Sequence, residues 1–214
     1  MVPYSVILWD WNGTLADDLD ASLRSTNDIL KKRNVPPINL EQYYAYIDTP
    51  ISRFYEHLLD LNEVPMEVIG GEFYAFYQKY FEGLHQGAAE LLEDLKQAGL
   101  RQVILSSAHR NNVEQDTARF GIRNYFDDLL AADDLLAAGK VERGLQWIAR
   151  QPEPPQSMVL IGDTLHDLDT ARAMGVDCIL CAMGHQSEAD LRASGAKVVT
   201  AFSQLRPLLL PETL

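Results

Sequence analysis

The sequence predicts an α/β fold in which a parallel sheet is interrupted by an inserted all-helical segment. Three observations support this prediction. Short apolar runs of strand length alternate with amphipathic stretches of helical periodicity over residues 84–214. A further apolar run at 6–9 has the unbroken hydrophobicity of a central strand that is covered on both faces. Between these two parts, residues 16–83 show helical spacing and contain most of the aromatic residues.

The composition is that of an ordinary globular protein. The 214 residues are 47% hydrophobic and 23% charged, with a formal net charge of −13. Because no cluster of Lys and Arg is present, we expect no nucleic-acid partner. No apolar run is long enough to span a bilayer, and the N-terminus lacks the basic and apolar segments of a targeting signal. We therefore expect no membrane partner and a cytoplasmic location.

The first predicted strand ends abruptly in a charged residue. Polarity begins at Asp10, directly after the apolar run 6–9, and Gly13 and Thr14 follow. The chain is therefore expected to turn sharply over the carboxyl end of this strand. Open α/β sheets usually bind their ligands at that end.

The segment after Leu15 changes to helical periodicity. Leu19, Leu23 and Leu30 follow helical spacing, with Asp17 and Asp18 placed to favour the helix N-terminus. Further helical blocks are expected at 40–61 and 66–81, separated by prolines. The aromatic side chains of the third block are expected to pack between helices: Phe73, Phe76, Tyr77, Tyr80 and Phe81.

The remainder of the chain alternates helices and strands. Helices are expected at 87–98, 112–120, 141–150, 166–174, 187–193 and the C-terminus, and strands at 102–106, 126–131, 158–161, 178–182 and 197–199. Strands separated by single helices imply right-handed crossovers and a parallel sheet. The insertion follows the first strand directly, so we expect a discontinuous core domain of residues 1–15 and 84–214 and a helical domain of residues 16–83.

The two cysteines form a Cys-x-x-Cys pattern, which is compatible with metal or redox chemistry. Cys178 and Cys181 fall within a predicted strand, where residues three apart point to opposite faces. No second cysteine pair is present to complete a zinc site. We expect both thiols to be buried and structural.

Four motifs carry a family resemblance. Asp10-Trp-Asn-Gly-Thr-Leu15 resembles the first motif of the haloacid dehalogenase (HAD) superfamily, whose phosphatases have Asp-x-Asp-Gly-Thr-Leu. Val103-Ile-Leu-Ser106 is similar to the second motif, Lys140 to the third, and Gly162-Asp-Thr-Leu-His-Asp167 to the fourth, Gly-Asp-x-x-x-Asp. The resemblance covers essentially the whole chain and implies a Rossmann-like core with a helical C1 cap that closes over the site. The layout most resembles phosphoglycolate-phosphatase-like members.

The resemblance implies a phosphoric monoester hydrolase and gives each matched residue a role. Asp10 would attack phosphorus and form an aspartyl-phosphate. Lys140 would stabilise charge on Asp10 and on the transferring phosphoryl group. The Ser106 hydroxyl would bind a phosphate oxygen, with Thr14 and Ser107 as further substrate-binding candidates. The substrate would be a small phosphorylated metabolite.

The resemblance also implies a Mg²⁺ ion. Its ligands would be Asp10, the backbone carbonyl of Asn12 and Asp163, with Asp167 close by or contributing. Carboxylates at this spacing suit a hard divalent cation. Such an ion removes the repulsion between a carboxylate nucleophile and a phosphate dianion.

Asn12 departs from the family pattern, which has an Asp acting as general acid and base at this position. A carboxamide cannot protonate a leaving group or deprotonate water, and such catalysis is typically worth about 10²–10⁴ in rate. The protein is then a slow phosphatase, uses another base such as Asp17, or binds phosphate or a partner with little turnover. An introduced Asp-to-Asn change would give the same sequence. His166 is a less favoured substitute for the missing acid, and substrates with good leaving groups should lose least.

A dehalogenase is a further alternative, because that branch of the superfamily also lacks the second Asp. It dispenses with Mg²⁺ and lacks the fourth-motif acids, so Asp163 and Asp167 favour phosphoryl transfer. Substrate identity is expected to lie mostly in the cap. Residues 46–54, with Arg53 and His57 nearby, are candidates for contacting the substrate, although a solvated helix surface is the favoured interpretation.

Overall fold

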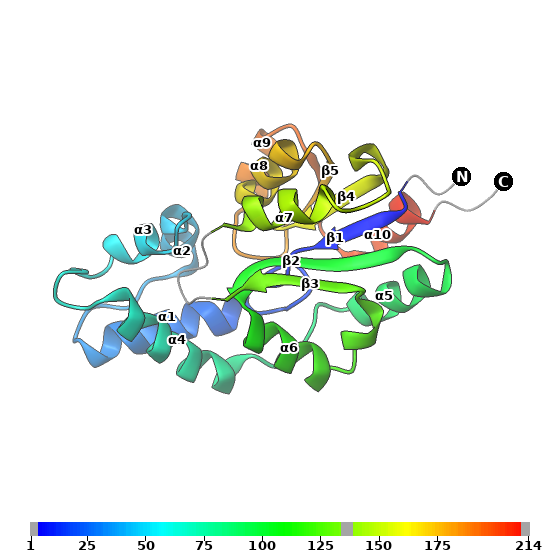
Figure 1. The fold of residues 1–214 in the computed structure, drawn as a ribbon. Coiled ribbons are helices and arrows are strands. Elements are labelled where there is room, and N and C mark those ends of the chain that lie inside the picture. Colours follow the sequence, from blue (N-terminus) through cyan, green and yellow to red (C-terminus); the bar gives the residue numbers. More distant parts are fainter. Residues whose placement is uncertain (1–3, 134–138, 211–214) are drawn as a thin grey trace.

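A six-stranded parallel sheet forms the core, in the order β3-β2-β1-β4-β5-β6 (Figure 1). The computed structural model describes residues 4–133 and 139–210. The strands are β1 (Val6–Trp9), β2 (Arg101–His109), β3 (Asp128–Ala132), β4 (Met158–Gly162), β5 (Asp177–Cys181) and β6 (Lys197–Val199). The chain runs outward from β1 to β3 and then returns to β4 on the other side of β1, so the topology switches between β1 and β4. Ligands bind at such switch points.

Helices cover both faces of the sheet (Figure 1). They are α5 (Ala88–Gln97), α6 (Arg110–Arg119), α7 (Lys140–Ile148), α8 (Leu165–Met174), α9 (Glu188–Ala193) and α10 (Phe202–Leu209). The alternating side chains of β1 divide the core, because Ile7 and Trp9 pack with α5, α6 and α10. Val6 and Leu8 pack with α7 and α8. This arrangement confirms the predicted α/β fold.

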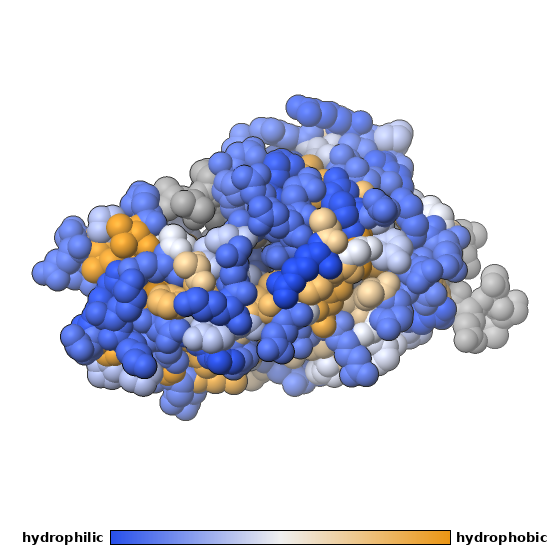
Figure 2. All heavy atoms as spheres, turned by 90° about the horizontal axis from the view of Figure 1, so that it is seen from below, coloured by the Kyte–Doolittle hydropathy of each residue, from blue (hydrophilic) through white to orange (hydrophobic). Residues whose placement is uncertain are grey.

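The segment between β1 and α5 is helical and lies beyond the carboxyl edge of the sheet, at the left of Figure 1. It contains α1 (Leu19–Lys32), α2 (Leu40–Tyr46), α3 (Ser52–Glu56) and α4 (Met66–Tyr80), which share an apolar cluster of their own. The chain enters and leaves through two adjacent linkers, since Ala16 bridges to Leu84. Apolar side chains also show on the surface of this helical part in Figure 2.

One expectation about the helical segment is wrong. The block at 40–61 is not one helix: α2 ends at Tyr46 and the short α3 begins at Ser52. Pro50 explains the break, because proline lacks a backbone N–H and disfavours helical geometry in the residue before it. Among the aromatic residues of α4, Tyr77 is buried and belongs to a cluster that joins the helical segment to the sheet.

Other predicted elements differ only at their ends. The strand expected at 102–106 extends to His109, and the strand expected at 126–131 begins at Asp128, after a short 3₁₀ helix (Arg123–Tyr125). Both cysteines are free thiols in β5. The predicted burial is confirmed for Cys181, whereas Cys178 is half-buried. Within the described ranges, no helix is both long and apolar enough to cross a membrane.

Candidate active site

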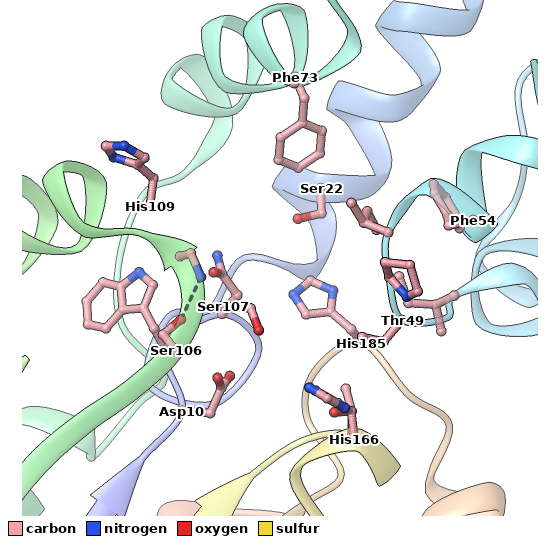
Figure 3. A pocket seen from close by; sticks show the side chains of 18 of the residues that line it. Asp10, Ser22, Thr49, Phe54, Phe73, Ser106, Ser107, His109, His166 and His185 are labelled. Atoms are coloured by element: carbon pink, nitrogen blue, oxygen red, sulfur yellow. Dashed lines mark hydrogen bonds between the residues drawn. The ribbon is translucent and has the colours of Figure 1, made fainter. Parts of the chain in front are cut away.

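Residues from the four predicted motifs meet at the carboxyl end of the sheet. Figure 3 shows Asp10, Ser106 and His166 around the cavity. Asp10 follows β1, Ser106 lies in β2, Lys140 begins α7, and Asp163 and Asp167 follow β4. The parallel strands bring these segments together because their carboxyl ends share one edge. All five residues line a cavity of about 340 Å³, together with Asn12 and Ser107.

The three carboxylates form a compact buried cluster. Ligand oxygens of Asp10, Asp163 and Asp167 lie within 4.8 Å of one another. The Lys140 ammonium joins two of them, because its Nζ donates to Asp10 Oδ1 and to Asp167 Oδ1, each at 2.5 Å. One lysine therefore faces three acids.

Local structure fixes the Asp163 carboxylate. Its Oδ1 accepts from the Thr14 hydroxyl at 3.1 Å, and its Oδ2 accepts from the His185 backbone N–H at 2.6 Å. Glycines give it room, since a Cβ on Gly13 or Gly184 would lie 2.2 or 2.1 Å from Asp163 Oδ2. Gly13 also has φ +70°, a left-handed conformation that glycine adopts without strain. The sharp turn predicted after β1 serves this packing.

Asp167 is held by the first turn of α8. Its Oδ2 accepts from the Thr164 backbone N–H at 3.0 Å, from the Thr164 hydroxyl at 2.7 Å and from the Asp163 backbone N–H at 3.2 Å. This is a capping box, in which the residue three positions into the helix bonds back to the helix start. The other carboxylate oxygen is thereby directed at Lys140.

The electrostatics of the cluster suit a cation. Burial raises the pKa of Asp10 to about 8 and the pKa of Asp163 to about 6. Burial acts in the same direction on Asp167, but the adjacent Lys140 ammonium outweighs it and holds the pKa of Asp167 below its ordinary value. Three buried oxygen donors with one lysine leave negative charge uncompensated. The donor set therefore fits a hard divalent cation such as Mg²⁺.

Ser106 is oriented toward the cavity. Its side chain is buried, and its Oγ accepts from the Ala108 backbone N–H at 3.1 Å, the dashed line in Figure 3. This bond leaves the hydroxyl hydrogen to donate to a ligand oxygen. Ser107 is half-buried and also lines the cavity.

Asn12 turns its amide nitrogen away from the carboxylate cluster. Its Nδ2 donates to Asp18 Oδ2 at 2.6 Å and to the Tyr77 hydroxyl at 3.3 Å. Asp18 is fully buried and also accepts from the Gly13 backbone N–H at 2.6 Å and from the Tyr77 hydroxyl at 2.9 Å. The Asp18 carboxylate is therefore hydrogen-bonded to the side chain at position 12, where the family has its second acid.

A buried histidine completes this network. His185 Nε2 lies 3.2 Å from Asp18 Oδ1, and its Nδ1 lies 3.0 Å from the Tyr43 hydroxyl. Burial opposes protonation, but Asp18 dominates and raises the pKa of His185 to about 9. The His185 charge in turn holds the pKa of Asp18 below its ordinary value despite burial. Both shifts favour the ionic form of the pair.

Two of the candidate residues are not part of the cavity lining. Thr14 is fully buried, and its hydroxyl donates to Asp163. The Asp17 side chain is 61% exposed and lies beside His85, with 3.7 Å between Oδ1 and Nδ1. The neighbouring Asp18 lies beside Asn12 instead.

The remaining candidates separate into two groups. His166, in α8, is half-buried and lines the cavity. Of the segment 46–54, residues 47–51 and Phe54 line it too. Arg53 is exposed and pairs with Asp48 at 3.3 Å, while His57 stacks on Tyr46. Neither Arg53 nor His57 is part of the cavity lining.

Comparison with known proteins places the chain in a family. The model of the haloacid dehalogenase-like hydrolase family matches residues 7–181. The tyrosine-protein kinase PtkA of Mycobacterium tuberculosis is 25% identical, covering 91% of this chain and 68% of that protein. A phosphoglycolate phosphatase of Synechococcus elongatus is 26% identical, covering 88% of each.

A solved structure supports the same conclusion for the fold. The haloacid dehalogenase-like protein SP0104 from Streptococcus pneumoniae superposes with a TM-score of 0.82 at 18% identity, covering 96% of this chain and 98% of that one. The family model spans most of the chain and includes all the motifs that meet at the cavity. The protein belongs to the haloacid dehalogenase-like hydrolase family.

Proposed function

We propose that this hydrolase is a Mg²⁺-dependent phosphatase that cleaves a small phosphomonoester through an aspartyl-phosphate on Asp10. The observation that carries the proposal is the buried cluster of Asp10, Asp163 and Asp167 with Lys140 bridging two of its members. The phosphoglycolate phosphatase among the relatives supports the proposal, since its name describes the release of phosphate from a small phosphomonoester. The cluster is the reason to prefer a phosphatase to a dehalogenase.

The first step is attack by an Asp10 carboxylate oxygen on phosphorus. Lys140, which already contacts Asp10, and the Ser106 hydroxyl would hold the phosphoryl oxygens and stabilise their charge. Asp10, Asp163 and the backbone carbonyl of Asn12 would hold Mg²⁺, with Asp167 close by. When bound, the ion would offset the repulsion between carboxylate and phosphate.

Asn12 limits proton transfer in both steps. Its amide nitrogen is engaged by Asp18 and Tyr77, and a carboxamide has no proton to give at neutral pH. Departure of the leaving group and attack of water on the aspartyl-phosphate therefore proceed without an acid or base at this position. We expect turnover to be slow for leaving groups that need protonation.

The helices α1–α4, which belong to residues 16–83, would form a cap on the core of residues 1–15 and 84–214. Their side chains line the cavity opposite Asp10, as Phe73 and Ser22 do in Figure 3. The two adjacent linkers at Ala16 and Leu84 would act as its hinge. Closure would exclude water from the site.

The test is phosphate release from a panel of phosphomonoesters with Mg²⁺ or with EDTA. Asp10→Asn should abolish turnover, whereas Asp17→Asn, an exposed control nearby, should leave it unchanged. Metal-independent halide release from a haloacid would support the dehalogenase alternative. Mg²⁺-dependent phosphate binding with no turnover of any ester would support a binding protein.

A further inference from the structure

The cavity has a strongly apolar side opposite the carboxylates. Side chains from the helical part form this surface, which we call the cap-side wall: Ile47, Ile51, Phe54, Met66, Phe73 and Tyr74. Figure 3 shows Phe73 projecting from α4 into the space above Asp10. With a volume of about 340 Å³, the cavity has room for an organic group beyond the phosphoryl site.

The cations that line the cavity are already paired. Lys140 is shared by Asp10 and Asp167, and the His185 side chain is paired with Asp18. No arginine belongs to the lining formed by the described residues, and Arg53, which lies nearby, holds Asp48. Residues 134–138, outside the described ranges, contain no Lys, Arg or His.

Two other histidines belong to the lining. His166 is half-buried in the first turn of α8. His109 Nδ1 accepts from the Asn111 backbone N–H at 3.3 Å. Two carboxylates, Asp48 and Asp116, also border the cavity. A second anionic group on the substrate would therefore meet acids, and it would find no arginine and no unpaired lysine among the described lining residues.

The position of Asn12 restricts the leaving group independently. Without an acid to protonate it, the departing oxygen must carry its negative charge away. A phenol has a pKa of about 10, as tyrosine has, whereas the pKa of water, which an aliphatic alcohol resembles, is about 16. A phenolate therefore departs much more readily than an alkoxide, and its ring matches an aromatic wall.

We propose that the substrate is an aryl phosphate monoester whose aryl group carries no second anionic group. The inference rests on the proposed phosphatase function and narrows its substrate class. Asp10 forms a bond to phosphorus while the bond to the aryl oxygen breaks, and that oxygen leaves with the electron pair as phenolate. Water then attacks phosphorus and releases the Asp10 carboxylate. The protons from water end on the phosphate and on the phenol.

The first experiment separates charge from leaving-group chemistry. 4-(Acetylmethyl)phenyl phosphate and 4-(carboxymethyl)phenyl phosphate have similar size, and the methylene group keeps the pKa values of their leaving phenols alike, but the two compounds differ in charge. We expect kcat/KM to be at least about tenfold higher for the acetyl compound, because one unscreened like charge costs more than 1 kcal/mol at protein dielectrics. 2-Phosphoglycolate, with an alkyl leaving group and a carboxylate, should be worse by about 100-fold or more.

The second experiment alters the wall without touching the carboxylates. Gly70 in α4 lines the cavity, and a Cβ there meets no atom within 4 Å. The next residue, Gly71, has the same open surroundings but is exposed and outside the lining. Leucine favours a helix at either position. Gly70→Leu should lower kcat/KM for 1-naphthyl phosphate about tenfold, while Gly71→Leu should leave it within about twofold.

The outcomes distinguish the two proposals. Preference for neutral aryl phosphates, together with a selective effect of Gly70→Leu, supports the substrate class. Faster hydrolysis of 2-phosphoglycolate or of the carboxylate compound overturns it while leaving the phosphatase function intact. Equal effects of the two leucine variants also overturn it. Absence of turnover and of any phosphoenzyme with every ester overturns the phosphatase function itself.

Discussion

Restoring the family acid at position 12 should destabilise the protein unless Asp18 is changed with it. In Asn12→Asp, the amide that donates to Asp18 Oδ2 at 2.6 Å becomes a second carboxylate. The lost hydrogen bond to a charged group is worth about 1.5–3 kcal/mol. Two charges about 4 Å apart repel by about 4 kcal/mol at an effective dielectric of 20. Protonating one of them at pH 7 costs a similar amount, because its pKa is normally about 4.

We therefore expect Asn12→Asp to lower the free energy of unfolding by about 6 kcal/mol at pH 7.5. The new pair has a raised pKa in the folded state, so the folded protein binds the extra proton more tightly. The deficit should then shrink as the pH falls towards 5. Urea unfolding at both pH values measures this change.

The charge-conserving exchange Asn12→Asp with Asp18→Asn is the matched control. It keeps one carboxylate and one amide at hydrogen-bond distance, so it should recover about 2–3 kcal/mol relative to the sum of the single variants. Its activity on alkyl phosphates should exceed that of the parent by up to about 10²–10⁴, and its activity on aryl phosphates should rise less. If Asn12→Asp is as stable as the parent at pH 7.5, or if the two changes are additive, the structural reasoning fails.

Three further predictions concern kinetics, metal and pH. Aryl phosphates should give an initial burst of about one phenol per enzyme molecule, because Asn12 slows the attack of water on the aspartyl-phosphate more than it slows the departure of phenolate. Stopped-flow absorbance measures the burst, and phenol release that is linear from the start would contradict the prediction. Mg²⁺ at about 100 times its Kd should raise the Tm measured by calorimetry by about 5 °C, and Asp163→Asn should remove most of that rise. Equal Tm shifts in the parent protein and in Asp163→Asn would argue against Mg²⁺ binding at the carboxylate cluster. Burial raises the pKa of Asp116 to about 6, so ionisation between pH 4 and 6 costs stability in the folded state. Because Asp116 is partly exposed, Asp116→Asn should stabilise by only about 1 kcal/mol at pH 8, with no gain at pH 4; a gain independent of pH would assign the effect to packing.

The sequence predicted the position of those site residues that lie at the carboxyl ends of strands. Asp10, Ser106 and Asp163 each follow or end an apolar run, and parallel strands bring such positions together without further information. Asp167 follows from helix spacing after Asp163. The hydrogen bond from Thr14 to Asp163 could not be predicted, because the turn after β1 is tight and the sequence does not reveal which turn residues face the cavity.

Asp18 and His185 were missed for a different reason. Asp18 stands at the start of a predicted helix, where an acid is expected for its favourable interaction with the helix dipole, so its pattern is ordinary. His185 follows β5 in a loop with no periodic signal. Their partnership joins residues 167 positions apart and depends on how the helical insertion packs against the sheet. The signal available in the sequence was the Asn at position 12, which indicates that the acid is absent but not where a carboxylate lies instead.

The network behind Asn12 also bears on why an amide is stable at this position. Asp18 receives four donors, from Asn12, Gly13, Tyr77 and His185, and is fully buried. A second carboxylate at position 12 would replace one of these donors with an acceptor, so the Asp18–His185 pair and an Asp at position 12 exclude each other energetically. The missing acid is therefore part of a self-consistent arrangement and not an isolated defect. An enzyme with this arrangement depends on substrates whose leaving groups depart unprotonated. The cap-side wall independently favours the same substrates, because its uncharged apolar and aromatic side chains suit an aryl group.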